Sequence, residues 1–213
     1  MLRSEDHDEY VRTMGVELGT VVALLSHKLI ELQIVWNQYR QLFGEDEDTV
    51  HLLNRTAGLF FQVVQDQLWD SVLIGISKMT DPASTGKKRN LTLYALPDLI
   101  EDVDLCVIIR RMCIEAETEA QFARDHRNKR IAHEDHLHAT DKESHALPGV
   151  SREAVENMLE SIRAVLNTLN HHYRDTEVCY QSFVDYSGGR LLVSKLRKLE
   201  WLEGDDVARA EGD

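Results

Sequence analysis

Three polar side chains near one another in the sequence, Arg127, Asn128 and His133, have the types that phosphodiester chemistry needs. A neutral imidazole can both accept and give a proton near pH 7. A guanidinium binds a phosphate, or the extra negative charge of its transition state, and an amide can orient either group. Together the three side chains predict cleavage of a phosphodiester bond without a metal ion.

The geometry of a regular helix separates these three side chains. At about 100° per residue, Arg127 and His133 lie about 120° apart around the axis, and Asn128 and His133 about 140° apart. His126 is almost eclipsed with His133, so a strict one-face rule would choose a different pair. A bend or unwinding at the helix end, or a second copy of the chain, would bring Arg127 and His133 together. A solvated basic helix end remains the alternative.

Two blocks of the sequence resemble the HEPN superfamily, the higher eukaryotes and prokaryotes nucleotide-binding domains. The motif of that superfamily is an Arg, a polar residue and, a few positions later, a His near a helix end, matched here by Arg127, Asn128 and His133. An earlier block, Trp69-Asp70-Ser71 followed by Ser77-Lys78-Met79-Thr80-Asp81-Pro82, resembles the abortive-infection U-type branch. The resemblance spans roughly residues 11 to 173.

This resemblance implies an all-α, HEPN-like bundle that acts as a metal-independent endoribonuclease in phage defence or as a toxin. The 2'-hydroxyl of RNA would attack the adjacent phosphorus, with His133 as general base or acid, Arg127 stabilising the phosphoryl charge and Asn128 orienting His133 or the phosphate. It also implies a homodimer in which two copies of the motif share a cleft, and a nucleotidyltransferase-type antitoxin as a candidate partner. The expected RNA-binding residues are Arg124, Lys129 and Arg130.

Length and composition fit one cytoplasmic domain. The 213 residues, 43% of them hydrophobic, can bury one sizeable core, so a single domain over residues 1–213 is expected, with an acidic tail from about residue 204. The first residues lack an apolar signal region, and charges interrupt the most apolar stretch, Val21 to Trp36, so no membrane span is expected. Cys106 and Cys113, seven residues apart, are expected to face inward as reduced thiols.

A net charge of -13 argues against a general polyanion binder, because phosphate neutralisation dominates nucleic-acid affinity. Any contact with RNA must therefore be local. Cations gather at Lys87-Lys88-Arg89, at Arg110-Arg111 and from Arg124 to Arg130. We interpret the first two clusters as solvated faces or loops.

Apolar periodicity predicts four long helices and thus an up-and-down bundle. The first runs from Val11 with a heptad seam broken by Lys28, at Met14, Leu18, Val21, Leu25, Leu32, Val35, Tyr39 and Leu42. The second, Leu52 to Met79, is apolar on several faces, as expected for a covered central helix. The third, the motif helix, runs from about Asp104 to Glu134 with an inward stripe at Leu105, Ile108, Met112, Ala116, Ala120 and Ala123.

Shorter elements and the fourth helix complete the expected bundle. A short helix is predicted around Leu91 to Ile100 and a loop from His136 to Gly149. Ser151 is expected to cap the fourth helix, whose inward stripe is Val155, Met158, Ile162, Val165, Leu169 and Tyr173. A last short helix follows at Leu191 to Leu202.

Three other interpretations of the sequence compete with the nuclease. The histidine-rich stretch from His133 to His138 lacks the i, i+4 spacing of the zinc-protease helix motif, so we expect no metal and no cofactor. A non-catalytic RNA- or protein-binding module would use the first helix's seam as an exposed partner surface. A neutralising or regulatory partner would instead use an acidic surface to meet a basic protein.

Overall fold

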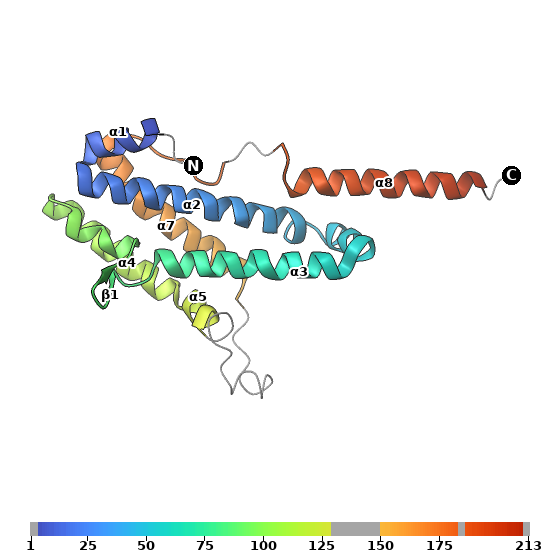
Figure 1. Cartoon of the computed structure of the whole chain (residues 1–213), viewed down its shortest axis with the longest axis horizontal. Helices are drawn as coiled ribbons and strands as arrows, with labels where there is room; N and C mark the ends of the chain where they lie inside the picture. The colour runs from blue at the N-terminus through green and yellow to red at the C-terminus, as the bar shows by residue number, and fades with distance from the viewer. Residues whose placement is uncertain (1–3, 129–149, 183–185, 211–213) are drawn as a thin grey trace. The chain divides into compact units, whose positions relative to one another are not determined.

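The computed structural model describes residues 4–128, 150–182 and 186–210 (Figure 1). Its contacts group into two compact units, one of residues 1–33 with 70–181 and the other of 34–69 with 182–213. The expected single domain over the whole chain stays a prediction. The elements run in the order α1 (Ser4–Met14), α2 (Val16–Phe43), α3 (Glu47–Met79), β1 (Ser84–Thr85), β2 (Lys88–Arg89), η1 (Leu93–Ala95), η2 (Pro97–Leu99), α4 (Val103–Glu119), α5 (Gln121–His126), α7 (Arg152–Arg174) and α8 (Gly189–Ala210).

The helix expected from Val11 onward is two helices, and the break is a glycine. Gly15 has a φ of +81°, a conformation that other residues rarely adopt, and the chain turns there from α1 into α2. The two helices then touch at Gly19, where an added Cβ would lie 2.4 Å from the carbonyl oxygen of Tyr10. The prediction of one long helix was therefore wrong, because only glycine fits the turn and the close contact after it.

The buried seam of α2 keeps every other position of the predicted seam and differs by one residue at the positions between them. The predicted positions Leu18, Leu25, Leu32 and Tyr39, each seven residues from the next, are buried. The buried positions between the first three are Val22 and Leu29 rather than the predicted Val21 and the interrupting Lys28. The complete seam is Leu18, Val22, Leu25, Leu29, Leu32, Trp36, Tyr39 and Phe43. This corrected seam follows the alternating three- and four-residue spacing of a packing helix without a charged interruption.

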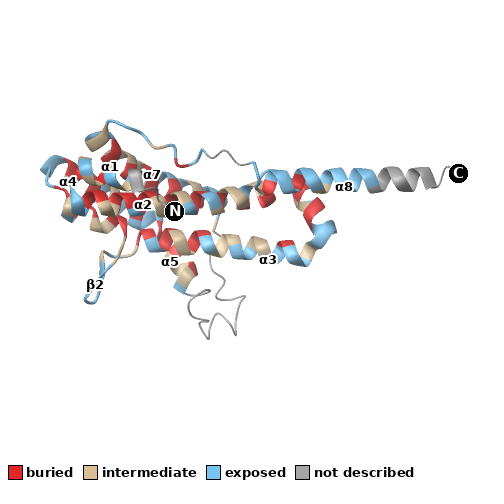
Figure 2. Cartoon of the chain, turned by 45° about the horizontal axis from the view of Figure 1, so that its top comes forward, coloured by how far each residue is buried: buried red, intermediate tan, exposed pale blue. Residues whose placement is uncertain are grey.

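The core of the first unit lies between α7 and the other helices of that unit. Ser151 caps α7 by accepting a hydrogen bond from the backbone N–H of Ala154, as predicted. The predicted stripe of α7 is fully buried except at Tyr173, which is partly exposed. Figure 2 shows the buried residues of α1, α2, α4 and α7 gathered on the sides where these helices meet.

The motif helix also divides in two. α4 ends at Glu119 and α5 begins at Gln121, with the fully buried Ala120 between them. Within α4, Ile109 is buried whereas the predicted inward residue Ile108 is 41% exposed. Cys113 is buried, as predicted, and Cys106 is half-buried. The alanine at the junction lets the helices approach closely, which a larger residue would prevent.

The second unit consists of the end of α2, the first part of α3 and α8. Trp36 stacks on Tyr39 with ring centroids 5.3 Å apart, and Trp69 packs against both rings. Arg55 of α3 forms a two-pronged ion pair with Glu200 of α8. This unit closes around aromatic side chains, with charged pairs at its surface.

The first part of α3 is not the covered helix that was predicted. Its backbone departs from helical geometry at Ala57 (φ -158°, ψ 65°), and Leu59 beyond this point is 80% exposed. Phe60 and Val63 are also exposed, whereas the apolar residues Val72, Leu73, Ile76 and Met79 near the end of α3 are buried. The prediction of a covered helix was therefore correct only for the part of α3 that belongs to the first unit.

Of the helices in the part of the chain that the structure describes, one, α2, is long and apolar enough to cross a membrane by length and composition alone. Half (50%) of its most apolar window is buried inside the protein. Core helices pass the same test, so the hydropathy of α2 does not by itself indicate a membrane span.

Candidate active site at the ends of α3 and α5

Three side-chain contacts join the end of α3 to α5 and the residue that follows it. His126 contacts Asp70, Arg124 contacts Thr80, and Arg127 contacts Asp81. The α3 side of these contacts is the earlier sequence block, and the α5 side is the start of the Arg-polar-His motif. The two blocks that carried the family resemblance thus meet in space.

Arg127 is held by Asp81 at one corner of its guanidinium. Its Nη1 lies 2.8 Å from each carboxylate oxygen of Asp81, and both side chains are 25% exposed. Its Nε donates to the side-chain oxygen of the neighbouring Asn128 at 3.2 Å. No described residue accepts a hydrogen bond from Nη2. The guanidinium is therefore oriented by two partners and keeps two N–H donors for an anion.

His126 forms a nearly buried pair with Asp70. Its Nε2 lies 3.0 Å from Asp70 Oδ1, and the exposed fractions of the two side chains are 6% and 26%. Because a carboxylate only accepts hydrogen bonds, Nε2 is the protonated ring nitrogen in this contact. The pair fixes the last turn of α5 against α3, one residue before Arg127.

Arg124, expected to bind RNA, contacts two backbone carbonyl groups. Its Nη1 donates to the carbonyl oxygen of Thr80 at 2.9 Å, and its Nη2 donates to that of Glu117. These carbonyls lie at the C-terminal ends of α3 and α4, where a cation also interacts favourably with the helix dipole. In this conformation Arg124 joins three helices, and its contact with RNA stays a prediction.

The structure places two of the three predicted catalytic residues. Arg127 and Asn128 are adjacent, and the backbone at both is a π-helical turn that continues α5. Such turns widen a helix and occur often at functional sites. His133, Lys129 and Arg130 lie outside the described residues. How His133 lies relative to Arg127 and Asn128 therefore stays a prediction.

Two acidic residues of this site, Asp70 and Asp81, were not among the predicted site residues. Both belong to the earlier sequence block, and Asp81 stands directly before Pro82 where α3 has ended. An acidic residue at the negative end of a helix dipole is unfavourable unless a cation compensates it. That unfavourable position was the available signal that Asp81 pairs with a cation from elsewhere in the chain.

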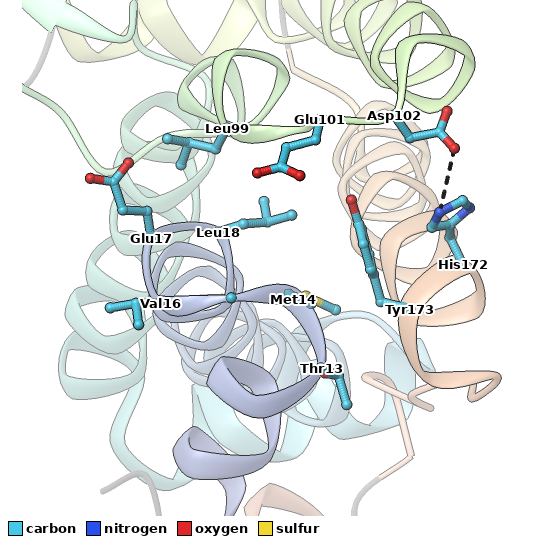
Figure 3. Close-up of a pocket in the computed structure, with 11 residues that line it drawn as sticks. Thr13, Met14, Val16, Glu17, Leu18, Leu99, Glu101, Asp102, His172 and Tyr173 are labelled. Carbon is cyan, nitrogen blue, oxygen red and sulfur yellow. Dashed lines mark ion pairs between the residues drawn. The ribbon is translucent and has the colours of Figure 1, made fainter.

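A cavity of about 740 Å³ lies elsewhere in the same unit, at the junction of α1 and α2 (Figure 3). Glu17, Glu101 and Asp102 line it, and His172 Nε2 lies 3.8 Å from Asp102 Oδ2. Burial raises the pKa of Tyr173 in its wall, as do the nearby Asp102 and Glu101 carboxylates. Carboxylates repel phosphates, so this cavity is a poor site for RNA, and it contains none of the predicted residues.

The described residues contain no group of three His, Cys, Asp or Glu side chains placed to hold a metal ion. The histidine-rich stretch from His133 to His138 is outside that part of the chain. At the α3–α5 contact, the guanidinium of Arg127 and the side-chain amide of Asn128 are groups that can donate hydrogen bonds to an anion.

The helical fold, with its two motif-bearing sequence blocks in contact, is that of an all-helical HEPN domain. The family model HEPN_AbiU2, described as AbiU2, matches residues 16–190, and the chain belongs to this family. Membership of this family indicates that the protein is of the abortive-infection, toxin-like kind. No curated protein and no solved structure matches the chain.

Proposed function

We propose that the protein is a metal-independent endoribonuclease that acts in phage defence or as a toxin. The observation that carries this proposal is the arrangement of Arg127, which Asp81 and Asn128 orient while Nη2 keeps its donors. A positioned guanidinium stabilises negative charge that develops on phosphoryl oxygens. Membership of an abortive-infection family gives such an activity a biological role.

In the proposed reaction the 2'-oxygen of a ribose attacks the adjacent phosphorus while His133 takes the 2'-hydroxyl proton. The bond from phosphorus to the 5'-oxygen breaks, and that oxygen receives a proton from an imidazolium or from water. Arg127 stabilises the charge on the non-bridging oxygens, and Asn128 keeps Arg127 in place through their hydrogen bond. The products are a 2',3'-cyclic phosphate and a 5'-hydroxyl, and DNA is resistant because it lacks the attacking group.

A homodimer is part of the proposal, with two copies of the motif in one cleft. Bringing two basic segments together costs Coulomb energy. The pairing of Arg127 with Asp81 lowers that cost, because each guanidinium carries a counter-charge with it. Mixing His133→Ala chains with Arg127→Ala chains should restore part of the activity if the two residues act across the interface. A nucleotidyltransferase-type antitoxin remains a proposed partner.

The test of the proposal is RNA cleavage by the purified protein in EDTA, compared with the Arg127→Ala and His133→Ala variants. Both variants should lose cleavage, and His133→Ala should keep the wild-type melting temperature. Arg110→Ala is the matched control, because Arg110 is exposed and pairs with Asp98 away from the site. Full activity of the Arg127→Ala variant, or a requirement for added Mg²⁺ or Mn²⁺, would contradict the mechanism.

The main alternative was a binding module that uses the first helix's seam as an exposed partner surface. Leu18, Leu25 and Leu32 of that seam are buried in the protein, so they are not available to a partner. The argument that favoured this alternative is therefore lost. RNA binding without cleavage in the EDTA assay would still return the protein to the class of binding modules.

A further inference from the structure

A short basic hairpin follows directly after the residue that holds Arg127. Strands β1 and β2 pair in antiparallel fashion, with Ser84 opposite Arg89 and Thr85 opposite Lys88, and Gly86 takes a φ of +60° in the turn. All residues of the hairpin are exposed, as Figure 2 shows for β2. From the sequence alone, its cations are expected to lie on a solvated face or loop.

The base of the hairpin is fixed to the chain just after Asp81. The side-chain amide of Asn90 donates to the carbonyl oxygen of Pro82 and to Thr85 Oγ1, each at 2.8 Å. The backbone N–H of Asn90 donates to the carbonyl oxygen of Ala83, also at 2.8 Å. Arg89 is therefore the sequence neighbour of Asn90, which contacts Pro82. Pro82 directly follows Asp81, whose carboxylate binds Arg127.

The three cations of the hairpin are uncompensated among the described residues. Lys87, Lys88 and Arg89 have no carboxylate partner there, whereas Arg127 pairs with Asp81 and Arg110 with Asp98. In a chain with a net charge of -13, these three successive cations form a local positive surface. Exposed cations near one another attract polyanions over about 10 Å at 0.1 M salt.

We infer that the hairpin of residues 84–89 binds the backbone of single-stranded RNA next to the phosphate that Arg127 holds. This inference rests on the proposed nuclease function and adds to it the surface that holds the substrate beyond the cleaved bond. Phosphate contacts of this kind supply affinity and register but no base specificity. The hairpin thus gives a strongly acidic protein a local basic surface for RNA.

The test uses a fluorescent single-stranded RNA with 2'-O-methyl riboses, which the proposed reaction cannot cleave. Its affinity for the full chain is measured as a function of salt for wild type and for Lys87→Gln/Lys88→Gln. Each lost phosphate contact should reduce the salt slope by about 0.7, so the double variant should lose about 1.4. The matched control is Lys195→Gln/Lys198→Gln, which removes the same charge from exposed positions of α8 and should leave the slope unchanged.

Kinetics with cleavable RNA separate binding from chemistry. The hairpin variant should raise KM at low salt and leave kcat unchanged, because the hairpin touches no reacting atom. A wild-type salt slope in Lys87→Gln/Lys88→Gln, with wild-type protein that binds and cleaves RNA, would overturn the hairpin inference alone. Binding without cleavage, but with the expected loss of slope, would support the hairpin and contradict the nuclease. No binding by wild type would overturn both.

Discussion

Arg127 Nη1 lies 2.8 Å from both carboxylate oxygens of Asp81, although 46 residues separate the two in the chain. The carboxylate can act in two opposite ways. It can position the guanidinium for a phosphate, or it can compete with the phosphate for that guanidinium. The contact at a single corner, which leaves Nη2 without an acceptor among the described residues, favours positioning.

We therefore expect Asp81→Ala to lower kcat for RNA cleavage by about ten- to a hundredfold, because a misplaced catalytic group costs that much. KM should change less. The effect should vanish in an Arg127→Ala background if Asp81 acts through Arg127. Asp98→Ala, which breaks the exposed pair with Arg110, is the control. Tighter RNA binding by Asp81→Ala would identify Asp81 as a competitor of the phosphate.

The pair of His126 and Asp70 is expected to be structural. Replacing His126 with alanine leaves the Asp70 carboxylate without its partner in a largely buried contact, which should cost about 1–3 kcal/mol of unfolding free energy. His172→Ala is a matched control, because His172 is 41% exposed and lies 3.8 Å from the Asp102 carboxylate, too far for a strong hydrogen bond. Chemical denaturation measures both variants. Equal stability of wild type and His126→Ala would show that the contact contributes nothing to folding.

Alanine substitutions at two glycines should have opposite effects on stability, because Gly19 lies at the close contact of α1 and α2 and Gly58 lies in open space on α3. Gly19→Ala would place a Cβ 2.4 Å from the Tyr10 carbonyl oxygen, so we expect a loss of about 1–3 kcal/mol. Gly58→Ala meets nothing within 4 Å and should gain up to about 1 kcal/mol from helix propensity. Thermal melts of the two variants compare them directly. A stabilised Gly19→Ala variant would mean that α1 does not pack on α2 at Gly19.

The buried thiol of Cys113 predicts how the protein responds to alkaline pH. Burial raises its pKa from 9.0 to about 12, and burial also raises the pKa of Tyr180. A raised pKa in the folded state means that the neutral form is favoured there, so the stability from Cys113 is complete below pH 9 and is lost between pH 9 and 12. The melting temperature should be level from about pH 7 to 8 and fall above about pH 9.

Alkylation checks the same thiol independently. At pH 8, iodoacetamide should modify the exposed Cys179 in the folded protein and reach Cys113 only after unfolding, because the thiolate is the reactive form. Mass spectrometry of the two peptides distinguishes them. Modification of Cys113 at the rate of Cys179 in the folded protein would contradict its burial.

The amphipathic part of the fold could be predicted from the sequence, and the uniformly apolar part could not. In α7, polar residues separate the apolar ones, so the stripe from Val155 and the cap at Ser151 follow directly from the pattern. In α2, nearly every face carries apolar residues, so periodicity could not choose between Val21 and Val22. A charged residue inside the chosen seam, Lys28, was the warning that the register was wrong.

The candidate site was also only partly predictable from the sequence. Residue types and their spacing select Arg127 and Asn128 as candidates, because the chemistry belongs to the side chains themselves. Asp81, the partner of Arg127, lies 46 residues away from it in the sequence, and no local pattern encodes a contact of that kind. The break at Ala120 likewise depends on packing in three dimensions. The catalytic role of His133 stays a prediction.

The most direct measurement of the central claim is the identity of the RNA ends that the protein produces in EDTA. A defined single-stranded RNA is incubated with the purified protein, and its fragments are analysed by mass spectrometry. The same RNA with one 2'-deoxyribose at the cleaved position is the control. We expect 2',3'-cyclic phosphate and 5'-hydroxyl ends from the first RNA and no cut at the modified position of the second. Fragments with 5'-phosphate ends, or equal cleavage of both RNAs, would contradict attack by the 2'-hydroxyl.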